Sequence, residues 1–173
     1  TCSQAQTLAS NMESGNHTSS LMFGVQWDLV LKYLETKGTS QVDLKTDSTS
    51  WGNYINNAWN ITNSNSKYAI YDDKLENFDW TSGAYGIKDS DTKVLLSTGA
   101  SDDFSKQGIY DLAGNVFEMT LEHTNSISRA RPRGTCTARG GGFYSWEDKN
   151  PVSVRLDISE IEFIGNGFRV SLF

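Results

Sequence analysis

The stretch GIYDLAGNVFE, residues 108–118, is the most distinctive segment of this sequence. Its two carboxylates, Asp111 and Glu118, lie seven positions apart, and Gly114 between them permits a tight backbone turn. Such a segment can wrap a hard cation such as Ca²⁺, which prefers carboxylate and carbonyl oxygens. The alternative is that Asp111, Asn115 and Glu118 only satisfy backbone groups of turns and loops.

Two further motifs follow this stretch: RGGGF at residues 139–143 and GFRV at residues 167–170. The three segments resemble, in the same order, the GLYDMAGNVWEW, RGGSW and GFRV signatures of the formylglycine-generating-enzyme family, also called the sulfatase-modifying-factor family. The resemblance covers most of the chain from about Leu21 onward. It implies that residues 1–173 form a single α+β domain with the C-type-lectin-like fold, which has two short helices, twisted antiparallel strands and long loops.

The resemblance also implies a metal site, because members of this family hold a calcium ion at the matching positions. The side chains of Asp111 and Glu118 and the backbone oxygens of Gly114 and Val116 are then the expected ligands. All of these ligands come from the protein, so we expect a structural ion.

Local sequence patterns agree with an α+β arrangement. Residues 5–12 are a modest helix candidate, and residues 24–34 are a strong one that ends before Gly38. In the second helix Trp27, Val30, Leu31 and Leu34 recur at spacings of three and four, as on one helix face. Residues 68–71 and 93–96 are expected to be short strands or loop segments. Residues 39–66 read as long loops pinned by aromatic anchors, and core packing is the expectation for four tryptophans: Trp27, Trp51, Trp59 and Trp80.

Composition disfavours two classes of partner. The net charge of −6 disfavours nucleic acid and anionic membrane surfaces, and no apolar run approaches the ~20 residues that a membrane helix needs. Cys2 and Cys136 are the only cysteines, and their spacing leaves open whether they pair.

The sequence also argues against catalysis. Oxidases of the family bind copper through a pair of cysteines just after the RGGSW motif. The corresponding residues 144–155 contain no cysteine, and Ser145 and Asn150 lie at about the positions that those cysteines would occupy. The two histidines, His17 and His123, cannot supply the three-histidine iron site of a related branch. We therefore expect no redox cofactor and no enzyme, with a formylglycine-type oxidase or related metalloenzyme as the alternative.

The segment after Gly140 mixes aromatic and acidic residues without a regular period, as binding loops do. It resembles the C-terminal variable region of proteins diversified by retroelements in bacteria and their phages, so residues 139–173 are the candidate variable region. The frame of that region would be Arg139–Gly141, Asn150, Pro151, Ser153, Arg155 and Gly167–Leu172, in which the glycines make turns and Arg155 and Arg169 anchor loops. The expected ligand-contacting positions are Gly142, Phe143, Tyr144, Trp146, Asp148, Leu156, Asp157, Ile158, Glu160 and Phe163.

The resemblance thus implies a receptor-recognition domain displayed on a phage tail or a bacterial cell surface. Its ligand is expected to be a variable protein, or less readily a glycan bound through calcium. The alternative is a fixed binding or structural domain of the same fold. Adenine mutagenesis of an asparagine codon yields neither Trp nor Glu, so Trp146 and Glu160 would derive from other codons or be invariant.

Overall fold

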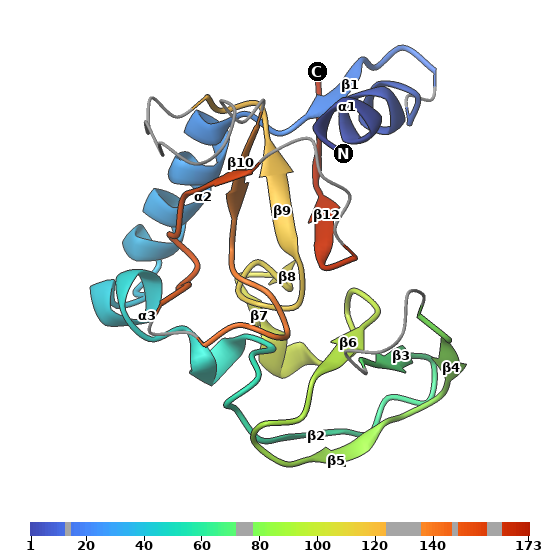
Figure 1. Cartoon of the computed structure of the whole chain (residues 1–173). Helices are drawn as coiled ribbons and strands as arrows, with labels where there is room; N and C mark the ends of the chain where they lie inside the picture. Colours follow the sequence, from blue (N-terminus) through green and yellow to red (C-terminus); the bar gives the residue numbers. More distant parts are fainter. Residues whose placement is uncertain (13–14, 72–77, 124–135, 147–148, 159–163) are drawn as a thin grey trace.

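The computed structural model describes residues 1–12, 15–71, 78–123, 136–146, 149–158 and 164–173. Within these residues the chain is α+β, with three α-helices, two 3₁₀ turns and several small sheets that are mostly antiparallel (Figure 1). Helix α1 spans Cys2–Ser10, α2 Gly24–Thr36 and α3 Gln41–Lys45, and the 3₁₀ turns span Thr49–Trp51 and Asp102–Phe104. The coarse fold class expected from the sequence is therefore correct.

The two longer helices lie close to their expected positions. Helix α1 begins three residues earlier than expected because Thr1 accepts a hydrogen bond from the backbone N–H of Gln4 in a capping box. In α2, Trp27 and Leu34 are fully buried, and Gly38 follows with a φ of +97°. The expected apolar face of this helix is confirmed.

The strands form five small sheets within the described residues. One pairs β1 (Ser19–Leu21) with β13 (Val170–Leu172), and a second pairs β2 (Trp59–Ile61) with β5 (Gly86–Lys88). A third joins β4 (Thr81–Ser82), β3 (Lys67–Ile70) and β6 (Val94–Leu96) in that order, which confirms that the two short apolar segments expected there are strands. A fourth pairs β7 (Ser105–Lys106) with β8 (Ile109–Tyr110).

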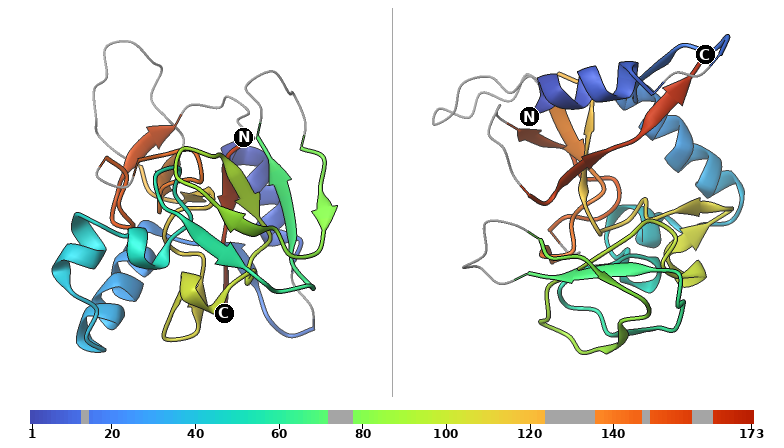
Figure 2. Two further views of the ribbon diagram at one scale, coloured as in Figure 1. Left: turned by 90° about the horizontal axis from the view of Figure 1, so that it is seen from below. Right: turned by 90° about the vertical axis from the view of Figure 1, so that its right-hand side faces the viewer.

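The fifth sheet is central and has the order β11 (Leu156–Ile158), β10 (Cys136–Arg139), β9 (Phe117–Thr120) and β12 (Asn166–Phe168). Glu118 of β9 is in register with Arg139 of β10 on one side and with Gly167 of β12 on the other. The three distinctive motifs of the sequence therefore meet on adjacent strands. In Figure 1 and in the right-hand view of Figure 2, α1 lies above this sheet and β2–β5 lie below it.

Three apolar clusters fill the interior. The first joins α2 to Trp51, Tyr54 and Leu112, and the second joins α1 to Met119 and Cys136 of the central sheet. A third lies around Ile61 and Phe104. Across the second cluster Cys2 and Cys136 form a disulfide with a Cα–Cα distance of 6.0 Å, which answers the pairing that the sequence left open.

One tryptophan differs from expectation. Trp27 and Trp51 are buried and Trp59 is half-buried, whereas Trp80 is 49% exposed. Trp80 immediately precedes the two-residue strand β4, whose residues are both exposed as well. No helix in the described residues is both long and apolar enough to cross a membrane.

Candidate ligand-binding loop and the buried acidic pair

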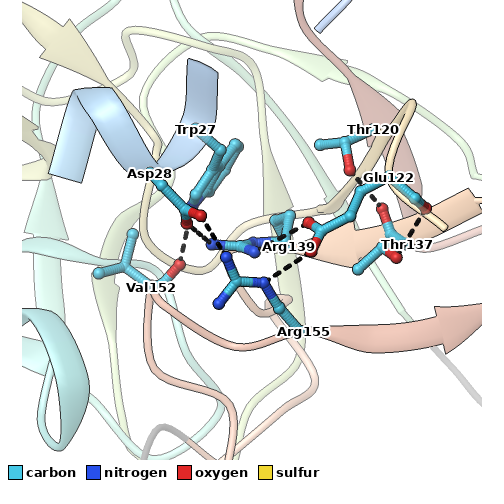
Figure 3. A network of polar contacts seen from close by, with 8 residues as sticks. All are labelled: Trp27, Asp28, Thr120, Glu122, Thr137, Arg139, Val152 and Arg155. Carbon is cyan, nitrogen blue, oxygen red and sulfur yellow. Dashed lines mark hydrogen bonds and ion pairs between the residues drawn. The ribbon is translucent and has the colours of Figure 1, made fainter. Parts of the chain in front are cut away.

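A four-residue ionic network holds both ends of the segment between β10 and β11 (Figure 3). Arg139, at the end of β10, places Nη2 2.8 Å from Asp28 Oδ1 and Nη1 3.1 Å from Glu122 Oε2. Arg155, just before β11, places Nε 2.8 Å from Glu122 Oε1 and also pairs with Asp28. The same two carboxylates thus bind both arginines. The expected role of Arg155 as a loop anchor is confirmed.

Arg139 is the buried member of this network, with no exposed side-chain surface, whereas the side chain of Arg155 is 45% exposed. The guanidinium of Arg139 lies 5.7 Å from the centroid of a ring of Trp27, which is in the first turn of helix α2. Burial, with a contribution from the charge of Arg155, lowers the pKa of Arg139. A buried cation of this kind depends mainly on its two carboxylate partners, because they oppose both its desolvation and the positive charge of Arg155.

The first two glycines of the RGGGF motif are required by the backbone. Gly140 and Gly141 have φ values of +89° and +80°, and a Cβ at Gly141 would lie 2.5 Å from the carbonyl oxygen of Asn150. The Tyr54 hydroxyl donates a hydrogen bond of 3.1 Å to the carbonyl of Gly140. Farther along the segment, the Trp27 indole donates one of 3.2 Å to the carbonyl of Val152. The loop is therefore pinned along its length as well as at its ends.

The aromatic residues after these glycines are layered from the interior outward. Phe143 is only 1% exposed, and its ring contacts those of Tyr71, Phe78 and Tyr144 at centroid distances of 5.8, 5.9 and 5.1 Å. Tyr144 is half-buried and contacts Phe117, and burial raises the pKa of its hydroxyl. Phe143 supports the loop from beneath and offers no surface to a ligand.

The expected ligand-contacting positions thus have different environments. Trp146 is 47% exposed and Leu156 36% exposed, so these two present apolar surface. Tyr144, Asp157 and Ile158 are half-buried, and Ile158 packs against the disulfide-linked cluster. Gly142 is buried like Phe143, and a Cβ there would lie 3.0 Å from the ring of Tyr144. Three expected positions, Asp148, Glu160 and Phe163, lie outside the described residues.

The acidic pair of the GIYDLAGNVFE stretch is buried and shares one arginine. Asp111 is 3% and Glu118 4% exposed. Arg169 of the GFRV motif places Nε 2.6 Å from Glu118 Oε2 and donates from Nη2 to the carbonyl of Tyr110 at 2.7 Å. Asp111 Oδ2 accepts a hydrogen bond from the N–H of Gly99 at 2.7 Å, whereas Asp111 Oδ1 is buried with no hydrogen-bond partner in the described residues.

Burial dominates the protonation of this pair. It raises the pKa of Asp111 to about 6, against the Gly99 hydrogen bond and the charge of Arg169. It raises the pKa of Glu118 to about 7, again against Arg169. Two carboxylates with one guanidinium leave an uncompensated negative charge when both acids are ionised, and a cation at Asp111 Oδ1 would offset it. The donor types at this place therefore fit a hard cation.

The remaining residues of the stretch hold it to the neighbouring loops. Gly114 has a φ of +68° and donates its N–H to the carbonyl of Gly140 at 2.7 Å. The side chain of Asn115 accepts from the N–H of Leu96 and donates to its carbonyl, and it also accepts from the amide of Asn53. Asn115 thus satisfies backbone groups, as the structural interpretation proposed, but they belong to the end of strand β6 rather than to a loop.

Sequence reasoning missed the acidic partners of the two arginines. Asp28 follows Trp27 on a helix, and Glu122 lies two residues beyond β9. Each reads as an ordinary solvated acid. The position of α2 beside β10 brings Asp28 to the two arginines, and the pairing of β9 with β10 brings Glu122 to them.

Comparison with known proteins adds no relative: no protein-family model matches the chain, and the searches of curated proteins and of solved structures found no match either.

Proposed function

We propose that this protein is a non-catalytic ligand-binding domain whose contact surface is built on residues 142–163, within a retroelement-diversified variable region at residues 139–173. The observation that carries the proposal is the anchoring of Arg139 and Arg155. These two residues flank residues 140–154, which include the first part of the proposed surface, and both pair with Asp28 and Glu122, which lie outside the variable region. A loop whose ends are held by a fixed scaffold can change the residues between them without losing its place.

For the architecture we propose the C-type-lectin-like fold of the formylglycine-generating-enzyme family. In its support, the three segments that carry the resemblance lie on neighbouring strands, with Glu118 in register with Arg139 on one side and Gly167 on the other. Arg169 of the last motif pairs with Glu118 of the first, and Gly140 of the second accepts a hydrogen bond from Gly114.

The proposed ligand is a variable protein, and a glycan is the second choice. Trp146 and Leu156 give the surface exposed apolar area, and Tyr144 adds an amphipathic ring at its border. The proposed setting is a phage tail or a bacterial cell surface. The Cys2–Cys136 disulfide supports it, because disulfides persist in oxidising environments outside the cytosol.

A structural calcium ion belongs to the same proposal. Asp111 and Glu118 would hold it through side-chain oxygens, and Gly114 and Val116 through backbone carbonyls. The buried, unpartnered Oδ1 of Asp111 supports this assignment, since carboxylate oxygen is what calcium prefers. The ion would offset the excess negative charge of the acidic pair and play no part in any reaction.

The formylglycine-type oxidase remains the competing function. Its thiolates would have to come from Cys2 and Cys136, which are joined to each other. Metal analysis of the purified protein separates the two functions. Stoichiometric copper or iron would favour the oxidase, and calcium alone would favour the binding domain.

The test of diversification is the gene neighbourhood. We expect a reverse-transcriptase gene beside a near-copy of the sequence that encodes residues 139–173, differing from it only at adenines of the template copy. Differences spread over all four bases, or no copy, would rule out diversification and leave the fixed binding domain.

A further inference from the structure

The side chain of Lys88 ends among backbone oxygens. Lys88 is the last residue of β5, in register with Trp59 of β2, and it is 1% exposed. Its Nζ lies 5.6 Å from the centroid of a ring of Trp59. The ammonium donates hydrogen bonds of 3.1, 3.1 and 2.5 Å to three backbone carbonyls, those of Tyr54, Ile55 and Asn57. An ammonium has three donors, so these three carbonyls match all of them.

The three carbonyls belong to one turn, residues 54–57, between the 3₁₀ turn that ends at Trp51 and strand β2. Carbonyl dipoles directed at one point repel one another, and a cation placed between them removes the repulsion. An apolar side chain would fill the same space without the desolvation that lowers the pKa of Lys88 to about 8. The charge of Lys88 therefore points to a role beyond filling space, namely to hold this turn in one conformation.

The same turn holds the first part of the ligand loop at two points. The N–H of Ile55 donates a hydrogen bond of 3.2 Å to the carbonyl of Ser145. The hydroxyl of Tyr54 donates one of 3.1 Å to the carbonyl of Gly140. Trp146, which presents exposed apolar surface, directly follows Ser145. The turn at residues 54–57 thus determines where the backbone that leads to Trp146 lies.

We propose that Lys88 is a positioning residue for the ligand loop: its ammonium fixes the turn at residues 54–57, and this turn fixes residues 140–145 and so the place at which Trp146 is presented. The proposal rests on the function proposed above, in which this loop carries part of the contact surface. Both bonds from the turn end on main-chain carbonyls of the proposed variable region. They therefore persist when side chains in that region change, as a diversified surface requires.

The experiment measures amide hydrogen exchange residue by residue in the full chain, labelled with ¹⁵N, at about pH 6.5, where the ammonium is charged. The N–H of Ile55 reports its bond to Ser145, and the N–H of Ser145 reports its own bond to the carbonyl of Gly142. Lys88→Met removes the charge and retains an apolar chain. We expect exchange on the order of tenfold faster or more at both amides, and a change of less than about twofold in helix α2.

Lys106→Met is the matched control. The ammonium of Lys106 also lies 5.6 Å from a tryptophan ring, that of Trp51, but it pairs with Asp43 at 3.7 Å. Its removal should leave the exchange of Ile55 and Ser145 unchanged.

A small cation should replace the missing group. Lys88→Ala lacks the atoms from Cγ to Nζ, and propylammonium supplies the same atoms. We expect propylammonium to slow the exchange of Ile55 and Ser145 in this variant by about fivefold or more, and 1-propanol, which has a similar size and no charge, to have no effect. If Lys88→Ala does not fold by itself, recovery of folded protein in propylammonium but not in 1-propanol is the same test.

Three results would overturn the proposal. Equal acceleration at all amides, helix α2 included, would show that Lys88 contributes only to global stability. Faster exchange at Ile55 without a change at Ser145 would show that the turn does not hold the loop. Failure of propylammonium to rescue Lys88→Ala, or equal rescue by 1-propanol, would show that the charge is not the positioning group. These measurements use no ligand, so a failure of the proposed function would appear in the gene neighbourhood and not in these exchange rates.

Discussion

Arg169 Nε lies 2.6 Å from Glu118 Oε2, and this one guanidinium is the positive charge that opposes desolvation at both Glu118 and Asp111. The pair joins the last motif of the chain to the first. It also makes the middle of the sheet sensitive to protonation, because two buried acids share one arginine.

Stability should rise as the pH falls from about 8 to about 5. The pKa of Glu118 is raised from 4.5 to about 7, so the folded state holds a proton that the unfolded state releases, and this stabilisation is lost as the pH rises through 7. The difference corresponds to about 3 kcal/mol for Glu118. Urea denaturation in EDTA at several pH values measures it. Glu118→Gln should flatten the dependence, whereas Asp103→Asn, at an exposed position, should not. Identical pH slopes for wild type and Glu118→Gln would contradict the assignment.

Calcium should stabilise the protein in the opposite pH range. At pH 8 both acids are ionised, so millimolar Ca²⁺ is expected to raise the midpoint of thermal unfolding. At pH 5 both acids are protonated, so Ca²⁺ should no longer bind and the midpoint should not change. Asp111→Asn should abolish the effect. Magnesium at equal concentration is the control for ionic strength. A calcium response that Asp111→Asn retains would place the ion elsewhere.

The two arginines of the loop network should differ in their contribution to stability. Arg139→Ala removes a buried cation and leaves a cavity beside Trp27, so we expect a loss of about 3–5 kcal/mol in the free energy of unfolding. Arg155→Ala removes a half-exposed partner of the same carboxylates and should cost about 1 kcal/mol or less. Chemical denaturation of both variants measures the difference. Similar losses would show that burial does not govern the network.

Substitutions of Phe143 and Trp146 should distinguish a residue that supports the loop from a residue that contacts the ligand. Phe143→Ala is expected to destabilise the fold by about 3–5 kcal/mol, because its ring is buried among three others. Trp146→Ala should change stability by about 0.5 kcal/mol or less, since half of the side chain is exposed. Once a ligand is selected against this surface, Trp146→Ala is the variant expected to weaken its binding. A stable Phe143→Ala variant would show that the residue is not part of the core.

Reduction of the disulfide should destabilise the fold as a whole. Cys2 and Cys136 are 134 positions apart, so the cross-link removes much chain entropy from the unfolded state, and its loss should cost about 4 kcal/mol. The double variant Cys2→Ser/Cys136→Ser, compared with wild type with and without reductant, tests this by denaturation. Wild type in reductant should match the double variant. If reductant has no effect on wild type, the bond does not contribute.

Local sequence patterns predicted those helices and turns that depend on interactions between residues close in sequence. The spacing of Trp27 and Leu34 placed α2, because a helix of period 3.6 exposes one face to the core. The glycines at Gly114, Gly140 and Gly141 indicated turns, and all three have positive φ. The class of fold, α+β, and the need for a structured segment around Asp111 and Glu118 follow from such patterns.

Partners across the chain could not be predicted in this way. Lys88 reads as a surface residue but is 1% exposed, with its ammonium donating to the carbonyls of Tyr54 and Ile55, and burial lowers its pKa to about 8. Asp28 and Glu122 likewise gave no sign that they bind Arg139, which follows Asp28 by 111 positions. Phe143, which composition placed at the ligand surface, is in the core.

The sequence by itself therefore determined the two longer helices, the turns and the three motifs, since these depend on neighbours within a few residues. It did not predict α3 or β2, which lie within residues 39–66, where long loops were expected. The tertiary structure alone decided which charges are paired and which aromatic rings are covered. Burial and pairing depend on what packs against a side chain from distant parts of the chain, and that information appears only when the strands of the central sheet and the helices beside them come together.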